Sequence, residues 1–160
     1  MPNYVYCTLT VTGSKKAVAA LQSAAKGYDR EYVKSEAEKQ ALARTYQDQP
    51  LPDRFELFCF HALVPVPDKI LRSGFDRVGH DWEVKHWGTK WGASDIDVVI
   101  YPMSNGVAKV VYKFRTAWSE PLALLDQVAK DHPGVKLQLK CRDEDGGRTQ
   151  VTWKEGHRAK

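Results

Sequence analysis

The stretch NYVYCTLTVTGS, residues 3–14, sets the architecture of this chain. Small apolar side chains alternate in it with aromatic or hydroxyl side chains, and this period of two predicts a strand with one buried face. The predicted buried set is Val5, Cys7, Leu9 and Val11. Ser14 follows Gly13 and is suited to cap a helix, because its hydroxyl accepts a hydrogen bond from the first turn. The alanine-rich segment 17–25 predicts that helix, with Gly27 at its end.

Further elements follow on the C-terminal side. Apolar runs predict strands at 55–64, 95–101, 107–115, 135–141 and 149–153. Helices are predicted at 29–46, at 68–73 and, capped by Ser119, at 120–130. Asn105-Gly106 predicts a hairpin between two of the strands, because both residues tolerate a positive φ. The polar C-terminal end is expected to be frayed.

Without its middle section, the chain reads strand, helix, strand, strand, helix, strand. This order predicts an α+β protein with a ferredoxin-like split βαβ antiparallel sheet and helices on one face. A length of 160 residues fits a single domain spanning 1–160. The residues at about 27–94 then form a large insertion after the first helix.

Composition and charge narrow the function classes. The hydrophobic content is 42%, and no apolar run approaches the roughly 18 residues that cross a bilayer. The first residues lack the pattern of a signal peptide, so a cytoplasmic protein is expected. A net charge of +4 is compatible with an acidic partner. The three cysteines, Cys7, Cys59 and Cys141, are far apart and odd in number, which argues against disulfides and zinc and favours buried structural roles.

Three motifs carry a family resemblance: MPNYVYCTLTVTG at 1–13, HWGTKWGASD at 86–95 and FRTAWSEP at 114–121. They resemble the YubB ferredoxin-like family of plasmid and phage proteins, which is also called Api92-like. The chain departs from the family pattern at Tyr4, Tyr6-Cys7, His86, Gly92 and Glu120. The resemblance implies the fold but carries no settled activity. Electron transfer is excluded despite the fold name, because an iron–sulfur cluster needs four suitably spaced cysteines.

The first candidate site consists of tryptophans near glycines: Trp87, Trp91 and Trp118, with Lys90 and His86 beside them. These side chains could form an aromatic binding site with two basic groups. The favoured alternative is a buried plug that seats the insertion on the sheet.

The second candidate site is the sheet face opposite the helices. Strand alternation directs Tyr4, Tyr6, Lys113, Arg115, Lys136 and Lys140 to that face, a combination suited to nucleic acid. The segment KVVYKFRT lacks the glycine and the aromatic spacing of an RNA-recognition motif. Coverage of this face by the insertion is the favoured alternative.

The third candidate is Pro2, whose secondary amine would act as a general base in a tautomerase-type enzyme. No arginine is identifiable as its partner, and the five histidines lack metal-ligand spacing. No catalytic residue, metal or cofactor is therefore predicted. The preferred function is a non-enzymatic binding protein of a phage or plasmid that acts on a host protein, for example in counter-defence. Nucleic-acid binding is the alternative, and an edge strand at 149–153 suggests a homodimer. No membrane partner is expected.

Overall fold

The computed structural model describes residues 3–34, 36–37, 40, 44 and 54–160. The chain begins with the predicted strand, β1 (Tyr4–Gly13), and the predicted helix, α1 (Lys15–Ala25). Ser14 caps α1, because its Oγ accepts a hydrogen bond of 3.1 Å from the amide of Ala17. The four apolar residues of β1 are at most 3% exposed, so the predicted alternation is confirmed.

Six strands form one antiparallel sheet in the order β4-β5-β1-β6-β7-β8. The strands after β1 are β4 (Lys90–Ser104), β5 (Val107–Ala117), β6 (Val135–Asp143), β7 (Arg148–Lys154) and β8 (His157–Arg158). Helix α6 (Leu122–Asp131) connects β5 to β6. The predicted α+β class with an antiparallel sheet is confirmed.

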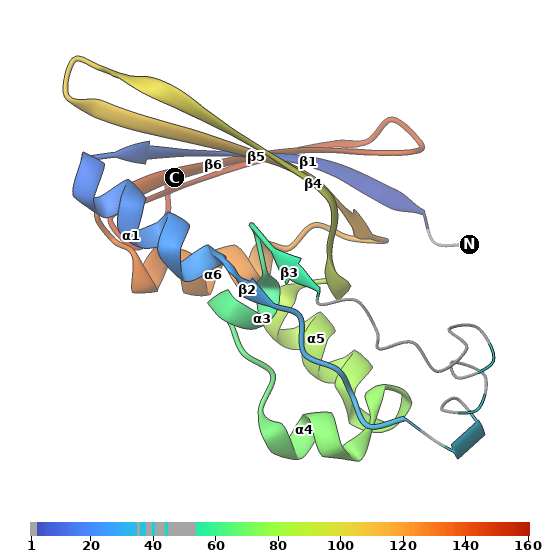
Figure 1. Cartoon of the computed structure of the whole chain (residues 1–160). Helices are drawn as coiled ribbons and strands as arrows, with labels where there is room; N and C mark the ends of the chain where they lie inside the picture. The colour runs from blue at the N-terminus through green and yellow to red at the C-terminus, as the bar shows by residue number, and fades with distance from the viewer. Residues whose placement is uncertain (1–2, 35, 38–39, 41–43, 45–53) are drawn as a thin grey trace.

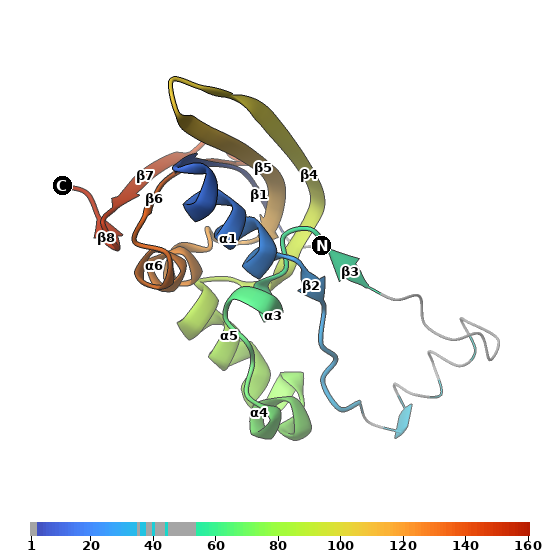
Figure 2. The ribbon, with the colours of Figure 1, turned by 60° about the vertical axis from the view of Figure 1, so that its left-hand side comes forward.

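Helices α1 and α6 lie on one side of the sheet, and both views leave the other side without a covering helix (Figure 1, Figure 2). The hydrophobic core lies between them and the sheet. Its largest buried side chains include Leu9, Leu21, Leu124 and Leu137. Full burial of such a side chain stabilises the fold by about 1.5–3 kcal/mol.

The described elements between α1 and β4 lie on the helix side of the sheet as well (Figure 1, Figure 2). They include β2 (Gly27–Tyr28), β3 (Phe55–Glu56), α3 (Phe60–Leu63), α4 (Asp68–Ser73), the π-helical turn η1 (Phe75–Gly79) and α5 (His80–Trp87). Contrary to the expectation, none of the described elements of this insertion covers the opposite sheet face. The apolar residues of the insertion, among them Phe58, Phe60 and Trp87, instead extend the core beneath the sheet.

The predicted strand at 55–64 is also wrong. Only Phe55–Glu56 is a strand, and Phe60–Leu63 is a short helix. Phe58, Cys59 and Phe60 are at most 1% exposed. The centre of the run is apolar because it packs in the core, whereas Phe55 and Leu57 are 50% and 44% exposed. Over so few residues, periodicity cannot separate a buried helix from a buried strand.

The predicted helix at 29–46 is wrong in its first part, because residues 29–34 form no helix. The amide of Asp29 instead donates to Arg54 O, and that of Val33 donates to Leu71 O. Most of the remaining part of this prediction lies outside the described residues. The short helix at 68–73 is confirmed.

The remaining findings concern one turn, one helix cap and the C-terminal end. Asn105 and Gly106 have φ values of 50° and 76°, as the predicted hairpin requires. Ser119 does not cap α6, because its Oγ donates to Gly88 O at 2.6 Å; the helix begins after Pro121. The C-terminal end is not frayed throughout, since β8 pairs with β7.

Candidate functional site

The uncovered face of the sheet carries a concentration of positive charge. Strand register directs cationic side chains of β5, β6 and β7 to this face, among them Lys109, Lys113, Arg115, Lys136, Lys140, Arg142 and Arg148. The carboxylates of Asp95 and Asp97 accompany them, and the Glu144 carboxylate accepts a hydrogen bond of 3.2 Å from the Tyr4 amide at one end of the face. Because β1 runs through the centre, its residues separate the cations of β5 from those of β6.

The register arranges these side chains in rows across the strands. Thr12 lies between Lys109 and Lys136, and Thr8 lies between Lys113 and Lys140. These two rows place a hydroxyl group at the centre and an ammonium group on each side. The outward residues of β1 follow one another at about 6.8 Å, so the track from Tyr4 to Thr12 is about 27 Å long.

The next row contains Tyr6, which lies between Arg115 on β5 and Arg142 on β6. Tyr6 is 52% exposed, so its ring is available to a ligand. Arg148 lies opposite Arg142 on β7 and continues the row. An exposed aromatic ring among guanidinium groups suits a planar, negatively charged ligand.

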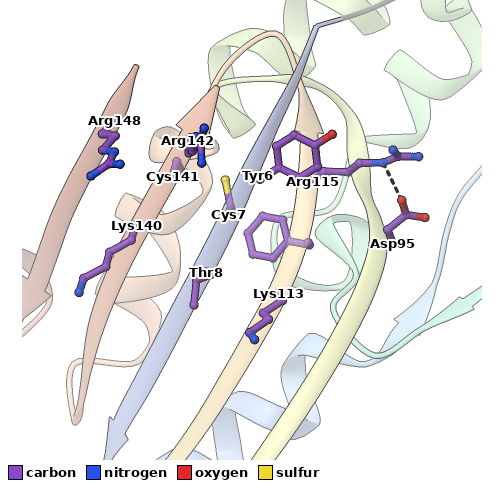
Figure 3. A pocket seen from close by; sticks show the side chains of 11 residues that line it. Tyr6, Cys7, Thr8, Asp95, Lys113, Arg115, Lys140, Cys141, Arg142 and Arg148 are labelled. Carbon is purple, nitrogen blue, oxygen red and sulfur yellow. Dashed lines mark ion pairs between the residues drawn. The ribbon is translucent and has the colours of Figure 1, made fainter. Parts of the chain in front are cut away.

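A shallow hollow of about 500 Å³ lies over this part of the sheet. Its lining includes Tyr6, Thr8 and Asp95 together with the five cations Lys113, Arg115, Lys140, Arg142 and Arg148. Figure 3 shows these side chains arising from neighbouring strands around Tyr6. The hollow therefore combines an aromatic surface with a clear excess of positive charge.

Arg115 is held in place by neighbouring groups. Its Nε lies 2.8 Å from Asp95 Oδ2, an ion pair drawn in Figure 3. Its guanidinium carbon lies 4.1 Å from the centroid of the Tyr4 ring. The other four cations of the hollow form no ion pair with the described residues, so an anion meets four unpaired charges there.

The cysteines beneath this face are structural. Cys7 and Cys141 lie opposite each other on β1 and β6, and both are buried. A hydrogen bond to Cys7, together with burial, raises the pKa of the Cys141 thiol. Burial likewise raises the pKa of Cys59 to about 11. Thiols with raised pKa values are poor nucleophiles.

The tryptophan candidate site separates into a buried part and an exposed part. Trp87 is fully buried, donates from Nε1 to Val64 O at 2.9 Å and packs against Phe60 and His61. The plug interpretation therefore holds for Trp87. His86 stacks on Trp82 at 4.3 Å, and its Nδ1 lies 2.9 Å from Trp82 O. His86 thus belongs to the packing of α5 and does not extend an aromatic site.

Trp91 and Trp118 do not form the expected plug. They are 43% and 56% exposed, and their φ values are 63° and 70°. Lys90 Nζ lies 4.2 Å from the ring centroid of Trp91. The segment is not a continuous loop: α5 ends at Trp87, Gly88 adopts a φ of 86°, and β4 begins at Lys90. Of the five residues of this candidate site, Lys90 and Trp91 are the ones that form a cation–π pair.

A buried polar cluster in the insertion escaped the sequence analysis. Glu83 is 2% exposed, and its two carboxylate oxygens accept hydrogen bonds from Tyr32 Oη at 3.0 Å and from the Trp91 amide at 2.7 Å. Burial raises the pKa of Glu83. The nearby His61 Nε2 lies 3.0 Å from Asp29 Oδ1. A glutamate on a short helix gives no signal of burial in the sequence, because its partners come from distant segments.

A second hollow, of about 520 Å³, lies within the insertion and is lined by this cluster and by charged residues of both signs. Most of those charges are paired, as Arg54 is with Asp29. Among the described residues, no group of three or more histidine, cysteine or carboxylate side chains is placed to hold a metal ion. The described part of the chain contains no helix with the length and hydropathy that a membrane span requires. Pro2 lies outside the described residues.

These features define an α+β protein with a covered sheet face and a bare, basic one. No family model matches the chain, and no curated protein matches it. Among solved structures, it is similar to the crystal structure of a protein api92 from Yersinia pseudotuberculosis, which is assigned to the family of unknown function DUF1281. The TM-score is 0.67 at 11% sequence identity, and the match covers 99% of this chain and 96% of the other. The chain therefore shares the Api92-like fold.

Proposed function

We propose that this protein binds single-stranded nucleic acid on the uncovered face of its sheet. The observation that carries the proposal is the hollow around Tyr6, where an exposed aromatic ring lies among four unpaired cations. Phosphates pair with the lysines and arginines, while an unpaired base stacks on the tyrosine. A duplex keeps its bases stacked on one another and makes no use of the exposed ring.

The proposed surface is narrower than that of an RNA-recognition module. Tyr112 and Phe114 on β5 are 1% and 4% exposed and point into the core. The face therefore offers Tyr6, with Tyr4 at one end and Tyr101 beside Lys109 on the outer strand β4, and not a central row of aromatic rings. Most of the affinity is expected from phosphate contacts, so binding depends strongly on salt and weakly on sequence.

The strand order β4-β5-β1-β6, with α1 after the first strand and α6 before the last, supports a further assignment. We propose that these four strands and two helices are a ferredoxin-like core, to which β7 and β8 add an extension. In a ferredoxin-like sheet the helices cover one face and leave the other bare, and the bare face is the one that we propose binds nucleic acid.

A binding titration tests the function. A fluorescently labelled oligothymidylate of twelve residues is titrated with the protein at several salt concentrations, with a blunt duplex of equal length as comparison. Four phosphate contacts predict a slope of about −2.8 when log affinity is plotted against log salt concentration. Binding is then about 50-fold weaker at about 200 mM salt than at about 50 mM. Absent binding, or binding that does not change with salt, would overturn the proposal. Tighter binding of the duplex would show that Tyr6 does not stack on a base.

A protein partner is a second candidate function, and the β4–β5 hairpin supports it. The hairpin extends beyond the helices (Figure 1) and carries exposed apolar side chains. Ile100, Tyr101, Met103 and Val107 are 44–68% exposed. Clustered exposed apolar groups are typical of interaction sites. The test is a pull-down with the Ile100→Lys/Met103→Lys variant as control, in which a specific partner must be lost.

The plasmid or phage origin, the host-protein target and the cytoplasmic location are predictions from the resemblance and the sequence. The homodimer is also a prediction, and part of the relevant β7 edge is already paired with β8 at Trp153 and Lys154. Catalysis by Pro2 has no supporting observation in the described residues.

A further inference from the structure

A smaller hollow of about 210 Å³ lies beyond the Tyr4 end of the basic face. Four parts of the chain form it: the beginning of β1, the bulged beginning of β4, the end of β5 and the residues at the β2–β3 ribbon of the insertion. Its lining consists of Tyr4, Asp29, Arg54, Glu56, Trp91, Gly92, Ala93, Ser94 and Ala117. Its volume is less than half that of the hollow around Tyr6, so it suits a single small group and not an extended chain.

This hollow is continuous with the basic face through one residue. The Arg115 guanidinium lies over the Tyr4 ring and is bonded to Asp95. Its Nε also donates to Ser94 Oγ at 3.3 Å. Arg115 and Asp95 line the large hollow, whereas Tyr4 and Ser94 line the small one. A strand lying along β1 therefore passes Arg115 before its end reaches the small hollow.

Two aromatic side chains border the small hollow. Trp91 is nearly half exposed and is fixed by the hydrogen bond from its amide to the buried Glu83 carboxylate. Its φ of 63° is strained for a residue that carries a Cβ atom. Strain of this kind collects at ligand sites. Next to it, Gly92 leaves open space, since an added Cβ would meet no atom within 4 Å.

The inner lining is polar and contains both donors and acceptors. Asp29 Oδ2 lies 3.2 Å from Arg54, which is exposed. Glu56 is partly buried beside them, and burial together with the nearby Asp29 raises its pKa to about 7. A base inserted here meets carboxyl oxygens and a guanidinium group at its hydrogen-bonding edge. Aromatic borders with a polar interior are how proteins hold an unstacked base.

We propose that the small hollow binds one unstacked guanine at the end of the strand that lies on the basic face. Guanine is favoured because its N1–H and N2–H₂ groups suit a carboxylate, while its O6 and N7 acceptors suit arginine. The inference rests on the proposed nucleic-acid function and adds base preference to it. Trp91 and Glu56 are the residues that distinguish this site from the rest of the face.

The test compares oligothymidylates of equal length in which one terminal residue is guanine, adenine, cytosine or thymine. The wild-type protein is expected to bind the guanine-containing strand at least about tenfold more tightly than the others. Glu56→Ala and Trp91→Ala are expected to remove this preference. Trp118→Ala is the matched control, because Trp118 is an exposed tryptophan that does not line the hollow.

The outcomes separate the two proposals. Salt-dependent binding of all four strands with equal affinity overturns the guanine site and leaves the nucleic-acid function standing. A preference for another base overturns the assignment of guanine. A guanine preference that survives in both folded variants overturns the location. Absence of binding to every strand overturns the nucleic-acid function itself.

Discussion

The double substitution Lys113→Gln/Lys140→Gln tests the basic face most directly. The two lysines lie on either side of Thr8, on β5 and β6, and both are exposed. They form no ion pair with the described residues, so their loss leaves no carboxylate without its partner. The fold is expected to be unaffected, since exposed substitutions usually change stability by no more than about 0.5 kcal/mol.

The magnitude follows from the number of charges. Each phosphate contact on a single strand contributes about 0.7 to the salt slope, so removing two of four contacts halves it from about −2.8 to about −1.4. At about 100 mM salt, the double variant is expected to bind the oligonucleotide about 25-fold more weakly than the wild type does. The fourfold salt increase from about 50 to 200 mM then weakens binding only about sevenfold.

The assay is fluorescence anisotropy of a labelled oligothymidylate at four salt concentrations. Lys16→Gln/Lys85→Gln is the matched control, because it removes the same charge from exposed lysines on α1 and α5, on the helix side of the sheet. A similar loss of affinity in both double variants would mean that binding depends on the net charge of the protein and not on the position of the lysines. An unchanged slope in the Lys113/Lys140 variant would refute the assignment of the face.

Three further predictions concern the fold and the insertion. Trp87→Ala is expected to destabilise the protein by about 3–5 kcal/mol in denaturant unfolding, because it empties a fully buried site, whereas Trp118→Ala stays within about 0.5 kcal/mol; equal losses would contradict the split between buried and exposed tryptophans. Gly88→Ala is expected to cost at least about 1–2 kcal/mol, since it forces a φ of 86° on a residue with a Cβ atom that meets Glu120 O at 2.9 Å; Gly92→Ala, at a glycine with open space, is its comparison. The raised pKa of Glu56, about 7, means that the folded state holds this proton more tightly than the unfolded state does, so its contribution to stability is full below about pH 4.5 and is lost as the pH rises through 7. Thermal unfolding at pH 5 and pH 8 is expected to show a smaller decrease in Tm for Glu56→Gln than for the wild type or for Glu155→Gln, and an unchanged decrease would contradict the assigned shift.

The sequence by itself determined the elements whose signals are local. Alternation in β1 identified its buried face, Asn105-Gly106 identified the hairpin, and Ser14 identified the beginning of α1. The same alternation directed Tyr6, Lys113 and Lys140 to the face away from the helices. Strand periodicity fixes which side chains share a face, because successive residues point in opposite directions.

The structure decided which faces are covered. The described elements of the insertion pack beneath the sheet and leave the basic face bare. No periodicity in the sequence indicates on which side of the sheet an insertion lies. The same packing buries Trp87 and leaves Trp91 exposed, although the two residues are four positions apart. It also brings Asp29, Glu56 and Trp91 to one hollow. Contacts between distant segments depend on how whole elements pack, and the sequence of any one element does not contain that information.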